Sequence, residues 1–210
     1  MQVWKLSALS VVLILLSAAN CPGHLPQVSA HATGKTYQGW AQTAPNINGE
    51  IVASEWERAR SESFSMDITG NPYSGTFYVM NDASNLYIGI KIADDDFNTG
   101  GTTDVAVIYF DSDNDGTFEP GEDSIAQFAG ATGFVDRFLE LYPTMKLDFD
   151  AGGTNDGSGA CAAHGGYNHF EFSHPLNSAD DAHDFSLQPL NTVGFTIGYR
   201  DGGLGVAVGY

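Results

Sequence analysis

The chain has few basic residues: 8 Lys and Arg stand against 26 Asp and Glu among 210 residues, which gives a formal net charge of −18. Nucleic acids and anionic membrane surfaces are bound through basic patches, so this scarcity excludes both as partners. Metal cations and neutral ligands remain compatible. Because so many like charges repel one another in a compact state, the composition also favours bound cations.

Cysteine and catalytic motifs are scarce too. Cys21 and Cys161 are the only cysteines, which excludes a dense disulfide framework. Cleavage after Ala19 leaves both, so that one disulfide can form, whereas cleavage after Ala32 leaves Cys161 alone. No G-x-S-x-G element and no Ser-His-Asp order is present. Neither Asp94-Asp95-Asp96 nor Asp180-Asp181 is marked as a carboxylate pair for glycoside hydrolysis. We therefore expect a protein that is not an enzyme.

Residues 1–32 predict a signal peptide with, in one reading, a pro-segment. Lys5 supplies the positive start, Leu6 to Leu16 the apolar stretch, and cleavage follows either Ala19 or Ala32. The apolar stretch is short for a membrane span, and an uncleaved anchor is the alternative. These features predict a secreted or cell-surface protein with no membrane contact beyond the signal peptide. No acidic residue precedes Glu50, so all the carboxylates belong to the exported part.

Residues 33–45 lack periodicity and predict an extended N-terminal arm before a single domain at 46–210. Residues 86–92 and 193–199 alternate apolar and polar positions, as half-buried strands do. Residues 53–60 predict a short helix, and the Gly-rich segment 152–166 predicts a mobile or ligand-facing loop. Further strands are expected at 74–80, 104–110, 123–129, 133–142, 145–150, 167–173 and 203–209.

Many short strands, no long amphipathic helix and 25 glycines indicate an all-β fold. We expect an antiparallel two-sheet β-sandwich of jelly-roll type. A closed barrel has the same periodicity and remains the alternative.

A metal loop is the most specific local pattern. Residues 111–122 carry D-x-D-x-D-G followed by Glu at the twelfth position, which is the oxygen-ligand pattern of a calcium loop. The predicted ligands are Asp111, Asp113, Asp115, the Thr117 carbonyl and Glu122. The alternative is an acidic surface turn, since Asp-Asn-Asp-Gly also forms turns.

The loop is not expected to be an EF-hand, because an EF-hand needs a helix on either side. The preceding residues 104–110 are apolar and β-branched, and Pro120 obstructs a helix inside the loop. A structural calcium that fixes a connection between two strands is therefore predicted. Nearby in sequence, His164, His169, Glu171 and His174 form no known zinc spacing, and we expect them to be solvent-facing strand residues.

Several segments together resemble the family 9 carbohydrate-binding modules and the wider DOMON-like group. They are Asn46-Ile47-Asn48-Gly49-Glu50-Ile51 with Glu55-Trp56, Leu86 to Ile92 with Asp94-Asp95-Asp96, Ile108 to Asp113, Glu171 to Leu176, and Val193-Gly194-Phe195. The resemblance runs from residue 46 to near the C-terminus. It implies a two-sheet sandwich with a structural calcium and, often, sugar binding.

The chain departs from this family in its aromatic residues. Family 9 modules clasp a sugar between tryptophans, whereas the mature chain has only Trp40, in the arm, and Trp56, in the fold signature and expected in the core. The candidate ring faces for a sugar are Trp40, Tyr73, Tyr142 and Tyr167. Some DOMON-like relatives hold haem, but Met66, Met80 and Met145 are expected to fill the core.

Two functions follow as hypotheses. The first is a secreted, non-catalytic, calcium-binding module that binds carbohydrate or a cell-surface glycan. The second is an extracellular structural protein that assembles into homo-oligomers, filaments or a surface layer, in which the arm at 33–45 pairs with a sheet edge of a neighbour and calcium contributes.

Overall fold

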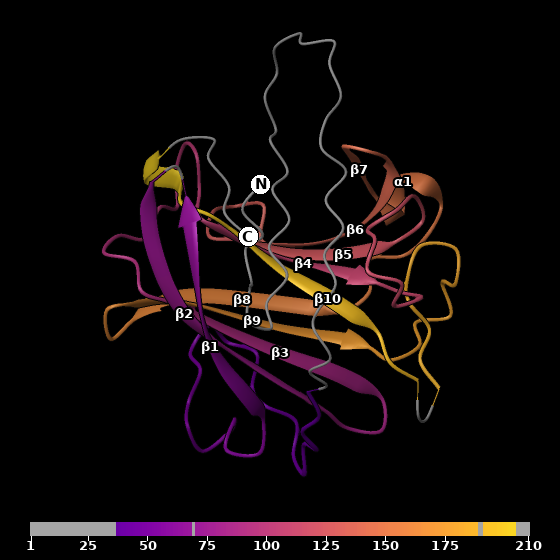
Figure 1. The fold of residues 1–210 in the computed structure, drawn as a ribbon, viewed down its shortest axis with the longest axis horizontal. Helices are drawn as coiled ribbons and strands as arrows, with labels where there is room; N and C mark the ends of the chain where they lie inside the picture. Colours follow the sequence, from indigo (N-terminus) through magenta and orange to yellow (C-terminus); the bar gives the residue numbers. More distant parts are fainter. Residues whose placement is uncertain (1–36, 69, 189–190, 205–210) are drawn as a thin grey trace, which may run out of the picture.

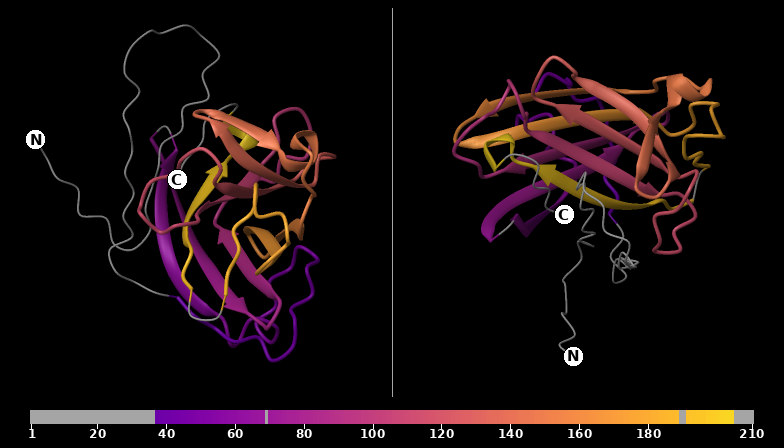
Figure 2. Two further views of the ribbon diagram at one scale, coloured as in Figure 1. Left: turned by 90° about the vertical axis from the view of Figure 1, so that its right-hand side faces the viewer. Right: turned by 90° about the horizontal axis from the view of Figure 1, so that it is seen from above.

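A computed structural model describes residues 37–68, 70–188 and 191–204 (Figure 1). Two five-stranded antiparallel sheets are stacked face to face, and the views in Figure 2 show the two layers. Sheet A has the order β1-β2-β3-β9-β8, and sheet B has the order β10-β4-β5-β6-β7. The predicted all-β two-sheet sandwich is confirmed. Within the described ranges, no helix has the length and apolar character needed to cross a membrane.

The strand bounds follow the sequence alternation in most places. Sheet A contains β1 (Arg60–Ile68), β2 (Asn71–Asn81), β3 (Asn85–Ile92), β8 (Ser158–His164) and β9 (Tyr167–Pro175). Sheet B contains β4 (Val105–Asp111), β5 (Asp123–Phe128), β6 (Phe134–Leu141), β7 (Thr144–Leu147) and β10 (Gly194–Arg200). A four-residue helix, α1 (Asp148–Ala151), follows β7, and a 3-10 turn, η1 (Gly202–Leu204), follows β10.

Three local predictions were wrong, and a fourth lies mostly outside the described residues. Residues 53–59 form turns rather than a helix, and a strand that was not predicted, β1, begins at Arg60. Residues 148–150 belong to α1, so the strand expected at 145–150 ends at Leu147. Much of the expected loop at 152–166 is the strand β8, which pairs with β9 from Ser158↔Ser173 to His164↔Tyr167. Of the strand expected at 203–209, residues 203 and 204 are part of η1 and the remainder lies outside the described residues.

The main core fills the space between the sheets. Its fully buried aromatic members include Phe77, Phe110, Phe170, Phe172 and Tyr199. These residues lie at alternate strand positions, so one face of each strand supplies the core. Burying such side chains contributes roughly 1.5–3 kcal/mol each to stability relative to exposure.

The described part of the N-terminal arm, residues 37–45, lies along its own domain. The Asn81 N–H donates to the Gly39 carbonyl (2.9 Å), and the Ala41 N–H donates to the Asn81 carbonyl (2.9 Å), forming a parallel bridge at the end of β2. The Tyr37 ring packs edge-on against Phe77 with the ring centroids 4.9 Å apart. The backbone of Asn81, at the end of β2, is therefore already hydrogen-bonded to the arm of the same chain.

Candidate functional site

A segment preceding β1 covers the outer face of sheet A (Figure 1, indigo), and one carboxylate fixes it there. Glu171, on β9, accepts hydrogen bonds at Oε2 from the backbone N–H of Asn48 (2.9 Å) and Gly49 (2.8 Å). Its Oε1 accepts from the indole Nε1–H of Trp56 (2.9 Å). Trp56 is only 3 % exposed, so the prediction that it is buried in the core is confirmed. Glu171 thus connects Asn48 and Gly49 with Trp56 through hydrogen bonds.

The expectation that His169 and Glu171 face solvent was wrong. Their exposed fractions are 2 % and 0 %, because the segment at 46–56 lies over them. The Nδ1 of His169 accepts from the Ile51 N–H (3.2 Å), so this ring also fixes the segment. Burial is the main cause that lowers the pKa of His169 to about 4, with Lys91 and His164 adding to it. His174 is also buried, whereas His164 is exposed.

The acidic loop at 111–122 connects β4 to β5, as predicted. One oxygen each of Asp111, Asp113 and Glu122 lies within 4.8 Å of the others, and Asp113 and Asp115 form a second such group with Glu119. Glu119 was not among the predicted ligands. Thr117 donates its backbone N–H to Asp115 Oδ1 (2.7 Å). The calcium itself stays a prediction.

Backbone donors shape this loop around its acidic side chains. Asp111 accepts from the N–H of Asp115 at Oδ1 (3.0 Å) and of Gly116 at Oδ2 (2.7 Å). Gly116 has φ +89°, a conformation that a residue without Cβ adopts at least cost. Glu122 is 6 % exposed, and burial chiefly raises its pKa to about 7, with Asp111 and Asp113 as further causes. A cation at this position would stabilise the charged form.

A second acidic cluster consists of Asp94, Asp96, Asp104 and Asp201, whose ligand oxygens also lie within 4.8 Å of one another. Each of these carboxylates accepts hydrogen bonds. Tyr199 donates to Asp94 (2.5 Å), and the Gly202 N–H donates to Asp104 (2.8 Å). Protein donors therefore already satisfy this cluster.

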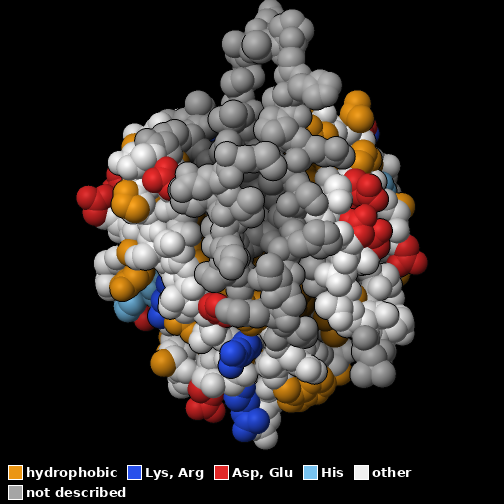
Figure 3. Space-filling model, in the orientation of Figure 1, with side chains coloured by type: hydrophobic (Ala, Val, Ile, Leu, Met, Phe, Trp, Pro, Cys, Tyr) orange, Lys and Arg blue, Asp and Glu red, His pale blue; other side chains and the backbone are white. Residues whose placement is uncertain are grey.

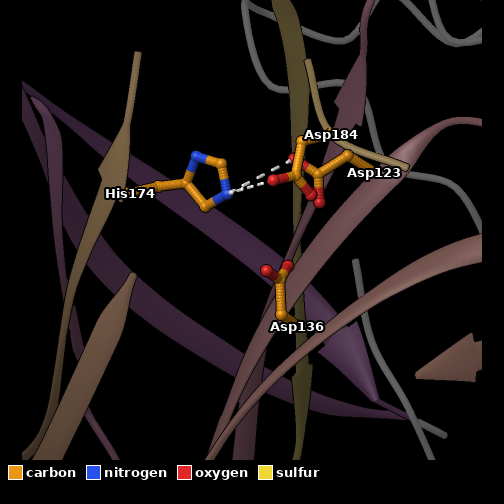
Figure 4. Close-up of side chains that lie close together, drawn as sticks. All are labelled: Asp123, Asp136, His174 and Asp184. Carbon is orange, nitrogen blue, oxygen red and sulfur yellow. Dashed lines mark ion pairs between the residues drawn. The ribbon is translucent and has the colours of Figure 1, made fainter. Parts of the chain in front are cut away.

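A third cluster was not predicted and lies inside the sandwich. Figure 4 shows the His174 ring directed toward Asp123 and Asp184, with the Asp136 carboxylate facing the same space. Their exposed fractions are 1 % for His174, 0 % for Asp123, 7 % for Asp184 and 1 % for Asp136. His174 Nε2 lies 3.9 Å from Asp123 Oδ2 and 3.9 Å from Asp184 Oδ2.

Burial dominates the electrostatics of the third cluster. Desolvation and the nearby Asp184 raise the pKa of Asp136 to about 8. Desolvation, then Asp136 and Asp184, raises the pKa of Asp148 to about 9, and the pKa of Asp123 lies well above its ordinary value for similar reasons. The sequence held one signal for this cluster: His174 falls at the same alternate positions as Phe170 and Phe172, which face the core.

The four candidate sugar-binding aromatics do not gather in one place. Trp40 is 57 % exposed beside the end of β2, and Tyr167 is 44 % exposed at the start of β9. Tyr142 is 38 % exposed in the turn between β6 and β7. Tyr73, on β2, is partly buried against the main core, and its hydroxyl donates to Asp201 Oδ2 (2.5 Å). No ring contact joins any two of them in the described ranges.

A surface pocket of about 280 Å³ lies between the arm and the turns at 54–58. It is lined by Ala41, Gln42, Thr43, Ala44, Asn46, Ser54, Glu55, Glu57, Arg58 and Met80. The lining combines hydrogen-bond donors with acceptors, and Glu55 Oε2 is buried without a partner among the described residues. On the face in Figure 3, acidic side chains lie at several points around the described surface, while basic ones gather near its lower edge.

Comparisons with known proteins agree with this architecture. Residues 47–130 match a family model described as carbohydrate family 9 binding domain-like. A family 9 carbohydrate binding module from Caldicellulosiruptor kristjanssonii, solved in complex with cellotriose, is similar at 14 % identity and a TM-score of 0.51, over 78 % of this chain and 76 % of that chain. A family 9 module from the same organism in complex with glucose has 15 % identity and a TM-score of 0.47, over 77 % and 76 %. A search of curated proteins found no match.

The family resemblance predicted from the motifs is confirmed. The matched residues 47–130 include the segment that Glu171 fixes and the strands β1 to β5. The similarity to the cellotriose complex covers 78 % of this chain and is a similarity of fold. Residues 47–130 are thus similar to the carbohydrate family 9 binding domain-like family, and the chain folds as a two-sheet β-sandwich.

Proposed function

We propose that this chain is a secreted, non-catalytic, calcium-binding β-sandwich that binds carbohydrate. The observation that carries the proposal is the match of residues 47–130 to the carbohydrate family 9 binding domain-like model. The relatives solved with cellotriose and with glucose suggest glucose-containing sugars as the first ligands to test.

The pocket beside the arm is the sugar site that we propose. Its volume of about 280 Å³ is close to the lower limit of about 300 Å³ for pockets that bind drug-sized ligands, which favours a short sugar or a chain end. Gln42, Asn46 and Arg58 offer hydrogen-bond donors to hydroxyl groups, and Glu55 Oε2 offers an acceptor without a protein partner. Trp40, next to the pocket in the chain, presents an exposed ring face to the apolar side of a pyranose.

Sugar binding can be tested by isothermal titration calorimetry with glucose and cellotriose. Trp40→Ala and Glu55→Gln are each expected to weaken binding about 10-fold or more, which corresponds to about 1.4 kcal/mol. Tyr142→Ala is the matched control, because Tyr142 is an exposed aromatic in the turn between β6 and β7 and not in the pocket. Undiminished binding by both pocket variants would assign the sugar to another surface. Absence of binding to any glycan on an array would refute the carbohydrate proposal.

The loop at 111–122 supports the calcium part of the proposal. Its carboxylates converge in a connection between strands, and hard oxygen ligands of this kind suit calcium. Asp111, Asp113 and Glu122 would hold the ion, which would neutralise part of the acidic surface and stabilise the folded state by mass action. Export is supported by residues 1–32 of the sequence, and N-terminal sequencing of protein recovered outside the cell distinguishes cleavage after Ala19 from cleavage after Ala32.

A further inference from the structure

The interior cluster of Asp123, Asp136, His174 and Asp184 joins elements that are distant in sequence. Asp123 opens β5 and Asp136 lies on β6, both in sheet B, whereas His174 lies on β9 in sheet A. Asp184 comes from the connection between β9 and β10. One ligand atom from each residue lies within 4.8 Å of the others, in a space closed off from solvent.

The polar atoms that face this space have no hydrogen-bond partner among the described residues. This holds for both carboxylate oxygens of Asp123 and Asp184, for Asp136 Oδ1 and for His174 Nε2. The separation of 3.9 Å between His174 Nε2 and its two carboxylate neighbours exceeds hydrogen-bond length. Buried polar groups are nearly always satisfied in folded proteins, so a set of such atoms around one point indicates a missing partner.

Two hydrogen bonds orient the side chains toward this point. His174 Nδ1 lies 2.8 Å from the Pro175 carbonyl, which accepts the Nδ1–H and so leaves the Nε2 lone pair directed at the carboxylates. Asp136 Oδ2 accepts from the Asp156 N–H (2.6 Å), which leaves Oδ1 free. Backbone carbonyls and amides orient metal-binding imidazoles and carboxylates in the same way.

The cluster gathers several carboxylates around one imidazole. His174 Nε2 lies beside Asp123 and Asp184, at 3.9 Å from each. Asp148, buried at the start of α1, adds a further carboxylate with both oxygens unpartnered. Bringing several carboxylates together away from water is strongly unfavourable unless protons or a cation neutralise them.

We propose that Asp123, Asp136, His174 and Asp184 bind one divalent first-row transition ion, with Zn²⁺ as the preferred ion, between the two sheets. An imidazole nitrogen is a ligand typical of such ions, whereas calcium takes oxygen ligands. Zinc forms bonds of about 2.0–2.2 Å to His and carboxylate ligands, so the ligand atoms of a tetrahedral site lie about 3.3–3.6 Å apart. Small side-chain shifts therefore bring these atoms onto one ion.

The ion has a structural role. Four protein ligands close a tetrahedral zinc site, and this site has no exposed position for a substrate. It links β5 and β6 of sheet B to β9 of sheet A and anchors the connection that carries Asp184. It is separate from the loop at 111–122, where all the grouped side chains are carboxylates.

Metal titration of the chelator-treated full-length mature protein tests the site, with ZnCl₂, MnCl₂ and CaCl₂ in separate calorimetric arms. We expect one zinc per chain at the interior site, bound more tightly than manganese and not displaced by about 100-fold excess calcium. His174→Ala should weaken zinc binding at least about 100-fold. Glu140→Gln, at an exposed position of β6 outside every group of metal-ligating side chains in the described ranges, is the matched control and should leave zinc affinity within about twofold of wild type.

Asp184→Asn should change the melting temperature in opposite directions without metal and with zinc. Without metal it should raise the melting temperature, because it removes one buried charge from the cluster. With zinc it should lower the melting temperature relative to wild type, because it removes a ligand. If these variants do not fold, crystals of the wild-type protein soaked in zinc should show an anomalous peak among the four side chains. No saturable zinc binding, unchanged affinity in His174→Ala, equal competition by calcium, or no anomalous peak would each overturn the proposal.

Discussion

The buried carboxylate of Glu171 offers the sharpest test of how the outer segment is held. Glu171→Ala removes the acceptor of three hydrogen bonds of 2.8–2.9 Å, from Asn48, Gly49 and Trp56. Hydrogen bonds to charged groups contribute about 1.5–3 kcal/mol each, and donors left buried without a partner lose a similar amount. The Asn48 donor is only partly buried and can bond to water, so its share is smaller. We therefore expect the free energy of unfolding to fall by about 4–5 kcal/mol.

A domain of this size loses about 2–4 °C in melting temperature per kcal/mol, so the expected fall is roughly 8–20 °C. Circular dichroism during heating and urea unfolding both measure it. The emission of Trp56 should also shift to longer wavelength, since its indole loses its partner. Glu171→Gln keeps one acceptor oxygen and should cost about half as much.

The matched control for this prediction is Glu140→Ala. Glu140 is an exposed strand residue whose carboxylate lies 3.2 Å from Lys146 Nζ, and surface pairs of this kind contribute at most about 1 kcal/mol. If Glu171→Ala were no more destabilising than Glu140→Ala, apolar contacts of Trp56 alone would hold the segment, and the role assigned to the carboxylate would be wrong.

Three further predictions concern the same segment and the acidic loop. Gly49 has φ +91°, and a Cβ there would lie 2.7 Å from the β8 backbone, so Gly49→Ala should lower the free energy of unfolding by about 2–4 kcal/mol in chemical denaturation. The control is Gly133→Ala, because Gly133 has φ +65° and open space around it, and this variant should lose only about 1 kcal/mol. Because the pKa of His169 is lowered to about 4, the folded state binds fewer protons than the unfolded state, and the free energy of unfolding should fall as pH drops from about 6.5 to 4. His169→Gln should make the free energy of unfolding less dependent on pH in this range. An unchanged pH dependence would mean that other groups cause the fall. Glu122→Ala should lower the melting temperature in calcium and abolish its rise on calcium addition, and a rise equal to that of wild type would place the ion elsewhere.

The sequence predicts the central strands better than the edges of sheet A. The strands β2, β3 and β9 alternate apolar and polar residues because both neighbours and the core constrain them. The two edge strands, β1 and β8, were not predicted. β8 reads Ser-Gly-Ala-Cys-Ala-Ala-His, and its small side chains give no periodic signal, since pairing with β9 through the backbone is enough to form it.

Whether a cluster of acidic side chains can be predicted from the sequence depends on how far apart its members lie along the chain. The ligands proposed for calcium lie within one loop, so their spacing alone brings Asp111, Asp113 and Glu122 together. The interior cluster takes its members from three strands and a long connection, and only the register of both sheets brings them together. The burial of Glu171 was missed for the same reason, because the segment that covers it lies more than 110 residues earlier.

The distance in sequence between Glu171 and its hydrogen-bond donors affects how the chain folds during translation. The bonds from Asn48, Gly49 and Trp56 span 115 to 123 positions to Glu171, so a chain emerging from its N-terminus cannot seal the outer layer until β9 has been synthesised. Contacts across such long intervals slow folding, because a large loop must close before any of them forms. The nascent polypeptide therefore stays incompletely folded for most of its translation, and its outer layer is completed only when the second half of the chain has been made.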